Sequence, residues 1–228
     1  MLRAELLAHL VEAIEGFERS NPVRVAIDGP DAAGKTTLAD ELASALRARG
    51  RPVIRASIDG FHRPRAERYR LGELSPDGYY YDSFDYEALC EALLDPLGPG
   101  GSRQYCQGTF DFQADSPASH AVELAPADAV LLFDGVFLLR PELVECWDLR
   151  VFVSVSGEVL LRRALARDGS LFGSPDETEL RYRRRYMPGQ QLYLKAACPV
   201  EAADLVVHND DPARPELESS GRPAGRGS

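Results

Sequence analysis

The chain has 228 residues, of which 44% are hydrophobic, and a formal net charge of −10. This length is enough for one sizeable hydrophobic core and short for two, so we expect a single domain over residues 1–209. The acidic balance argues against non-specific binding to nucleic acid or to an anionic membrane surface, because both attract clusters of Lys and Arg. We therefore expect neither among the partners of this protein.

Residues 1–20 predict an amphipathic surface helix and not a targeting segment, because Glu5, His9, Glu12 and Glu15 interrupt the apolar residues at helical spacing. No apolar run approaches the roughly 20 residues of a membrane span, so we expect a cytoplasmic protein. The four cysteines are widely spaced and have no nearby pair of histidines. This spacing disfavours a zinc site.

Strands and helices alternate along the rest of the chain. We expect strands at 23–28, 53–59, 129–134, 149–155 and 204–208, helices at 35–49, 86–94, 158–168 and 176–195, and a small antiparallel pair from 103–112 and 120–124. This order is typical of an α/β fold with a mostly parallel sheet and helices on both faces. Its active site should lie at the carboxyl ends of the strands. Residues 210–228 contain little to bury, and we expect a disordered tail.

A phosphate-binding loop is the clearest motif. Residues 29–36, Gly-Pro-Asp-Ala-Ala-Gly-Lys-Thr, match G-x-x-x-x-G-K-[ST] between a predicted strand and a predicted helix, which indicates a P-loop NTPase fold. Backbone N–H groups and the helix dipole would hold the phosphates, Lys35 would reach the β- and γ-phosphates, and Thr36 would ligate Mg²⁺. The residues predicted to bind ATP or GTP are Gly29, Asp31, Ala32, Ala33, Gly34, Lys35, Thr36 and Thr37.

The remaining motifs favour a kinase over other P-loop proteins. No N-K-x-D sequence, which GTPases use to recognise the base, occurs in the chain, and no internal repeat or extra module suggests a motor ATPase. Asp59 and Asp134 each end a predicted strand. We predict that Asp59 is the catalytic base and that Asp134 holds Mg²⁺, with Asp59 also within reach of the metal. The alternative for Asp59 is a turn residue before Gly60.

Several segments together resemble the uridine kinase family and its relatives, the phosphoribulokinases and bacterial pantothenate kinases. Besides the P-loop they are Asp59-Gly-Phe61, Asp82-Ser-Phe84-Asp85, Phe133-Asp134-Gly135, and the pattern from Arg162 through Tyr182 and Pro188 to Asp204. The resemblance covers about residues 23–209. It implies a kinase that phosphorylates the 5′-hydroxyl of uridine or cytidine, with a small lid and acceptor-binding insertion, and it leaves a homo-oligomer open.

The resemblance also implies roles for individual residues. Asp59 matches the catalytic base, Asp82 matches an acid that holds the ribose hydroxyls, and Arg163 and Arg167 correspond most nearly to the catalytic arginines of the lid. Arginine suits that task because its planar group contacts several phosphate oxygens at once. The family usually has Glu where this chain has Asp134.

The acceptor segment departs from the family pattern. Phe110 and Asp115 stand nearest to a tyrosine and a histidine that recognise the pyrimidine, and Phe110 can stack on a ring but cannot donate a hydrogen bond. We predict further acceptor contacts from His62, Arg63 and Tyr81.

The run of Arg63, Arg65, Arg68 and Arg70 suggests an alternative function, a kinase for a sugar phosphate or another non-nucleoside alcohol. These arginines could instead face water in a charged loop. An alternative of another class is a nucleotide sensor without catalysis. The presence of Lys35, Thr36, Asp59 and Asp134 favours an enzyme.

Overall fold

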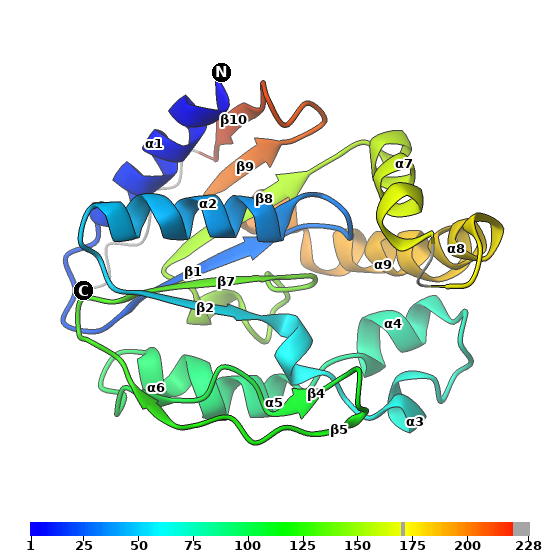
Figure 1. The fold of residues 1–228 in the computed structure, drawn as a ribbon, viewed down its shortest axis with the longest axis horizontal. Coiled ribbons are helices and arrows are strands. Elements are labelled where there is room, and N and C mark those ends of the chain that lie inside the picture. Colours follow the sequence, from blue (N-terminus) through cyan, green and yellow to red (C-terminus); the bar gives the residue numbers. More distant parts are fainter. Residues whose placement is uncertain (170–171, 221–228) are drawn as a thin grey trace.

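The computed structural model describes residues 1–169 and 172–220, and its centre is a six-stranded sheet in the order β10-β9-β8-β1-β7-β2 (Figure 1). The strands are β1 (Val23–Asp28), β2 (Val53–Ser57), β7 (Val130–Gly135), β8 (Leu149–Ser154), β9 (Leu205–His208) and β10 (Glu216–Ser219). Neighbouring strands pair in parallel except β10, which runs antiparallel to β9. The predicted α/β fold with a mostly parallel sheet is confirmed.

Helices cover both faces of this sheet. One face packs against α1 (Arg3–Glu15) and α2 (Lys35–Ala48). The other packs against α9 (Met187–Ala197) and a helical segment made of α5 (Tyr86–Leu89), a π-helical turn (Cys90–Leu94) and α6 (Asp95–Leu97). Because both faces are covered, every residue of β1 and β7 is buried, as expected of central parallel strands.

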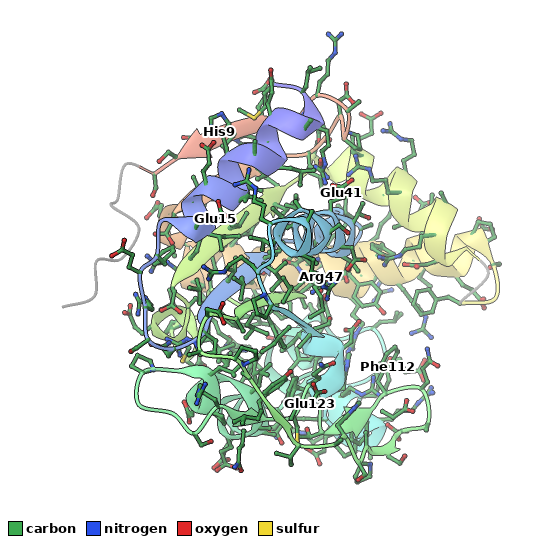
Figure 2. All side chains as sticks on the ribbon, turned by 60° about the vertical axis from the view of Figure 1, so that its left-hand side comes forward. His9, Glu15, Glu41, Arg47, Phe112 and Glu123 are labelled. Atoms are coloured by element: carbon green, nitrogen blue, oxygen red, sulfur yellow. The ribbon has the colours of Figure 1, made fainter. Side chains whose placement is uncertain are left out.

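An insertion between β2 and β7 forms the lower part of the molecule in Figure 1. It contains a 3₁₀ turn (Ile58–Phe61), α3 (Arg65–Arg68), α4 (Pro76–Asp82) and two short antiparallel pairs. These pairs are β3 (Gln104–Tyr105) with β6 (Glu123–Leu124), and β4 (Phe110–Asp111) with β5 (Ser116–Pro117). Phe112 and Glu123, labelled in Figure 2, lie on this insertion, far from His9 on α1. The single antiparallel pair predicted from the sequence is therefore two shorter ones.

The segment after β8 is helical. It comprises α7 (Gly157–Asp168), α8 (Pro175–Arg181), a π-helical turn (Tyr182–Tyr186), α9 and α10 (Pro199–Ala202), while a 3₁₀ turn (Val144–Cys146) precedes β8. Among the helices of the described ranges, none is long and apolar enough to cross a membrane.

The predicted disordered tail is wrong for its first part. Residues 216–219 form β10, whose register pairs Leu217 with Val207. Leu217 packs against the core beside α1, so this segment has an apolar contact that its Pro-rich and charged composition concealed. The rest of the predicted tail, 221–228, lies outside the described residues.

The packing of α2 predicts a large loss of stability on truncation of its central leucine. Leu42 is fully buried, so we expect Leu42→Ala to lower the free energy of unfolding by about 2–5 kcal/mol. The control is Leu124→Ala, at a side chain that is 65% exposed, for which we expect a change within about 0.5 kcal/mol. Urea unfolding of both variants measures this, and equal losses would contradict the assignment of α2 to the core.

Candidate active site

The phosphate-binding loop lies between β1 and α2, as the motif requires. Gly29 has φ +146° and Gly34 has φ +93°. A Cβ at Gly29 would lie 2.3 Å from the carbonyl oxygen of Val153 on β8, so only glycine permits this close approach. The loop is therefore packed directly against the neighbouring strand before it turns into α2.

Two buried polar side chains form hydrogen bonds with the backbone of the loop. Asp28 is fully buried and accepts hydrogen bonds from the N–H of Gly29 at 2.7 Å and from the hydroxyl of Tyr193 on α9. Burial raises the pKa of Asp28, while these hydrogen bonds lower it. Asn209, after β9, donates from Nδ2 to the carbonyl oxygen of Ala33 at 2.8 Å. The shape of the loop thus depends in part on Tyr193 and Asn209, which are distant in the sequence and were not predicted.

Lys35 lies in the loop, and its positive charge interacts with several nearby carboxylates. Its side chain is buried and donates from Nζ to the carbonyl oxygen of Pro30 at 2.7 Å. Burial lowers the pKa of Lys35, and the charges of nearby carboxylates oppose this effect; in order of size they are Asp31, Asp28, Asp134 and Asp59. Lys35 is therefore the cation that a bound triphosphate would meet, and carboxylates of the protein surround it.

Thr36 and Asp134 form the candidate pair of oxygen ligands, and their side chains are hydrogen-bonded to each other. The Thr36 hydroxyl donates to Asp134 Oδ2 at 2.6 Å, and Arg55 on β2 donates from Nη2 to Asp134 Oδ1 at 2.9 Å. Within the described ranges, no group of three or more His, Cys, Asp and Glu side chains could hold a metal ion. Mg²⁺ is commonly bound by one or two protein oxygens together with substrate phosphates. The two oxygen groups fit that ion, and Thr36 and Asp134 are the residues that would hold it.

Asp59 lies at the end of β2, at the first turn of the 3₁₀ segment, with a solvent-accessible side chain. Protein atoms still surround it on most sides. This desolvation, together with the charges of Asp31 and Asp134, raises the pKa of Asp59 to about 6. The side chain borders a pocket of about 380 Å³ that Thr36 and Asp134 also line. The predicted base and both predicted metal ligands therefore share one pocket.

Three other residues that line this pocket were not predicted from the sequence. They are Arg55, Gln107 and His120. The segment carrying Gln107 is brought there by contact of two glycines, because a Cβ at Gly60 would lie 3.1 Å from the Cα of Gly108. An arginine in an otherwise apolar strand was a signal for Arg55. No local signal points to Gln107 or His120.

The predicted acceptor residues lie close to the site but are engaged within the protein. His62 Nδ1 is 3.0 Å from the carbonyl oxygen of Asp59, and its ring packs against Phe84 and Phe112. Burial lowers the pKa of His62 to about 4, so the ring is neutral near pH 7. Arg63 donates from Nε to the carbonyl oxygen of Phe84 at 3.0 Å.

The other predicted acceptor residues lie away from the pocket. Tyr81 is 56% exposed, and Phe110 is buried in the insertion. Asp82 pairs with the exposed Arg70 at 3.3 Å. Asp115 accepts a hydrogen bond from the N–H of Arg65 at 2.8 Å. None of these four side chains lines the pocket beside Asp59.

The arginine run of the insertion is neutralised locally. Each arginine pairs with a carboxylate at 3.1–3.4 Å; the pairs are Arg63 with Glu67, Arg65 with Glu73, Arg68 with Asp115, and Arg70 with Asp82. Arg181 on α8 also binds Glu73, at 3.0 Å. This arrangement does not form a concentrated cationic site for a second phosphate group.

The two predicted lid arginines differ in their surroundings. Arg163 donates to the carbonyl oxygens of Asn209 and Asp210 at 2.8 and 3.2 Å. Arg167 donates to Asp168 at 2.7 Å, and its charge acts on Asp59. Arg167 therefore lies near the site, whereas Arg163 holds the segment after β9, and a catalytic role for either stays a prediction.

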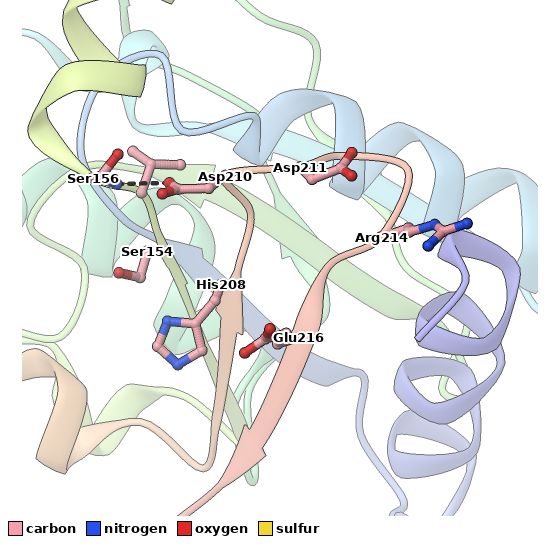
Figure 3. A pocket seen from close by; sticks show the side chains of 8 residues that line it. Ser154, Ser156, His208, Asp210, Asp211, Arg214 and Glu216 are labelled. Carbon is pink, nitrogen blue, oxygen red and sulfur yellow. Dashed lines mark hydrogen bonds between the residues drawn. The ribbon is translucent and has the colours of Figure 1, made fainter.

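A second pocket, of about 330 Å³, lies at the carboxyl ends of β8 and β9 (Figure 3). Asp210 accepts a hydrogen bond from the N–H of Ser156 at 2.7 Å at its edge. His208, Asp211, Arg214 and Glu216 line the rest. The excess of carboxylates makes this pocket unsuited to phosphate groups.

Comparison with known proteins agrees with this geometry. A model described as "Phosphoribulokinase / Uridine kinase family" matches residues 24–209. The chain belongs to this family. It is 28% identical over 213 residues to uridine-cytidine kinase B of Dictyostelium discoideum, covering 87% of this chain and 85% of that protein.

Two further proteins that are similar to this chain support the family assignment. The uridine kinase of Lactobacillus helveticus is 27% identical over 152 residues, covering 64% of this chain and 68% of its own length. The solved structure of a possible uridine kinase from Bacillus stearothermophilus has a TM-score of 0.69 and 25% identity, covering 89% of this chain and 97% of that one. Family membership makes this protein a phosphotransferase and implies ATP as its phosphate donor.

The contact between Asn209 and the loop leads to a prediction on nucleotide binding. Asn209 is 3% exposed, so Asn209→Ala leaves the carbonyl oxygen of Ala33 without its donor. We expect a loss of about 1–3 kcal/mol in the free energy of unfolding and weaker binding of an ATP analogue. Urea unfolding and calorimetric titration measure the two effects. The control is Asp211→Ala at an exposed position; an Asn209→Ala variant with unchanged nucleotide affinity would contradict the role of this contact.

Proposed function

We propose that this protein transfers the γ-phosphate of ATP to the 5′-hydroxyl of uridine or cytidine. The observation that carries the proposal is the pocket shared by Asp59, Thr36 and Asp134, next to the phosphate-binding loop. The names of the relatives, uridine-cytidine kinase B and uridine kinase, support a nucleoside as the acceptor. The local neutralisation of the arginine run supports a nucleoside over a sugar phosphate.

In the proposed mechanism, the backbone N–H groups of the loop and Lys35 bind the β- and γ-phosphates. Asp59 accepts a hydrogen bond from the acceptor hydroxyl, orients it toward the γ-phosphate and takes its proton during transfer. Arg167 offsets part of the negative charge around Asp59. Thr36 and Asp134 would hold Mg²⁺, which when bound would offset charge on the phosphate oxygens.

The pKa of Asp59 predicts the pH dependence of catalysis. Asp59 acts as a base only when deprotonated, so kcat/KM should rise as the pH passes through about 6 and level off above it. We expect Asp59→Asn to lower kcat by about 10²–10⁴-fold and to remove this acidic limb. An ADP-release assay with Mg²⁺-ATP and uridine, cytidine, other nucleosides, pantothenate and pentose phosphates measures both.

The control for this experiment is Asp128→Asn, an exposed carboxylate before β7, which should leave the rate and the pH profile unchanged. Turnover confined to a pentose phosphate or pantothenate would contradict the proposed acceptor. An Asp59→Asn variant that keeps the wild-type kcat would contradict the proposed base.

The pair of oxygen ligands predicts the metal requirement. Removal of Mg²⁺ with EDTA should abolish ADP release, and excess Mg²⁺ should restore it. Asp134→Asn should raise the Mg²⁺ concentration for half-maximal activity by at least about 10-fold, because an amide is a weaker ligand for a hard cation than a carboxylate. Titration of Mg²⁺ at saturating ATP measures the shift. An unchanged Mg²⁺ requirement would exclude Asp134 as a metal ligand.

A further inference from the structure

Asp31 is a carboxylate inside the phosphate-binding loop, where the site must accept a triphosphate. Its Oδ2 accepts a hydrogen bond from the hydroxyl of Tyr79 on α4 at 2.5 Å. No side chain or backbone group of the described ranges donates to its other oxygen, Oδ1. The contact therefore links the loop to the acceptor insertion and leaves one carboxylate oxygen for another partner.

Tyr79 is held firmly in the orientation that meets Asp31. Its side chain is 5% exposed, with ring centroids 4.9 Å from both Phe137 and Tyr186. Gly189 on α9 makes room for this ring, because a Cβ there would lie 2.6 Å from Tyr79 Cδ1. Burial and the Asp31 charge keep the pKa of Tyr79 well above its usual value, so the hydroxyl remains a donor. Tyr79 can thus fix the carboxylate in one orientation.

The hydrogen bond with Tyr79 on α4 places Asp31 on the side of the loop that faces the acceptor insertion. Among charged groups it has the largest effect on Lys35 and also on Asp59, where it exceeds Asp134. Its charge therefore acts on both the phosphate-binding lysine and the proposed base. Negative charge at this place opposes triphosphate binding, and a neutral amide would serve equally well as an acceptor for Tyr79. The charge suggests that the free oxygen accepts a hydrogen bond from a substrate hydroxyl.

The residue expected to bind such hydroxyls already has a partner within the protein. Asp82, which the family resemblance assigns to the ribose, accepts hydrogen bonds from Arg70 at both of its carboxylate oxygens. Asp31, whose charge helps to raise the pKa of Asp59, has an oxygen without a protein donor in the described ranges.

We propose that Asp31 binds the acceptor substrate, accepting a hydrogen bond at Oδ1 from a ring hydroxyl of the ribose, and that Tyr79 is the residue that positions it. This inference rests on the proposed function and deepens it. It assigns to the phosphate-binding loop a part in selecting the acceptor: polyols with a hydroxyl near the phosphorylated one are preferred over deoxy analogues. The loop then contacts both substrates.

The test compares wild-type protein and Asp31→Asn with uridine, 2′-deoxyuridine and 3′-deoxyuridine as acceptors. A charge-assisted hydrogen bond should make the KM for uridine rise roughly 10- to 100-fold in Asp31→Asn, while the KM for ATP changes less than about 2-fold. The wild-type enzyme should discriminate against one deoxyuridine by a similar factor, and Asp31→Asn should lose that discrimination. Tyr79→Phe should raise the KM for uridine by a smaller factor, roughly 3- to 10-fold, and weaken the same discrimination without changing kcat.

Asp77→Asn is the matched control, because it removes an exposed carboxylate of α4 and should change none of these values. A rise in the KM for ATP alone would overturn the inference and assign Asp31 to phosphate binding. Unaltered discrimination in Asp31→Asn would overturn it while the nucleoside kinase function stands. If the wild-type protein uses another alcohol and not uridine, the proposed acceptor is wrong. In that case the KM for ATP and the KM for that alcohol, measured with Asp31→Asn, still decide the role of Asp31. Absence of turnover with every acceptor would overturn both.

Discussion

The concentration of negative charge at the carboxyl ends of the strands is the constraint on which this site depends. Asp31, Asp59 and Asp134 all act on the single lysine of the loop. Like charges so close together raise each other's energy, and the protein offsets this with donors to two of the carboxylates: Tyr79 for Asp31, and Arg55 and Thr36 for Asp134. Asp59 lacks such a side-chain donor in the described ranges, and desolvation together with the charges of Asp31 and Asp134 raises its pKa to about 6. The carboxylate that must accept a proton is thus the one left without a compensating hydrogen bond.

The sequence predicted the parts of the site that depend on short stretches of consecutive residues. The phosphate-binding loop has a fixed spacing between a strand and a helix. Asp59 and Asp134 were predicted from the ends of two apolar segments, which form the parallel pair β2 and β7. The acceptor side could not be predicted in the same way. Whether Asp82 or Asp115 faces a substrate depends on which arginine of the insertion it meets, and Asp115 meets Arg68 across 47 residues of chain. The contacts of Asp28 with Tyr193 and of Ala33 with Asn209 span still greater separations, 165 and 176 residues.

The arginines of the helical segment after β8 illustrate why composition alone is a weak guide to function. Arg185 is 3% exposed and lies over the rings of Tyr69 and Tyr79, at 4.7 and 5.5 Å. It donates to the carbonyl oxygens of Glu73 and Ser75 at 3.2 Å. Such an arginine binds the acceptor insertion to α9 and its neighbouring π-helical turn. The segment that resembles a catalytic lid is therefore also part of the wall that supports Tyr79.

The last strand, β10, affects how one edge of the sheet can pair with other chains. β10 covers β9, whose Val206 and Val207 are buried on opposite faces of the sheet. A chain ended at Asn209 would present β9 as an uncovered apolar edge, which is a template for pairing with another strand. The outermost strand of the natural chain instead presents the exposed glutamates Glu216 and Glu218. Two copies that approached through this edge would bring these like charges together, which disfavours strand pairing at the β10 edge of the sheet.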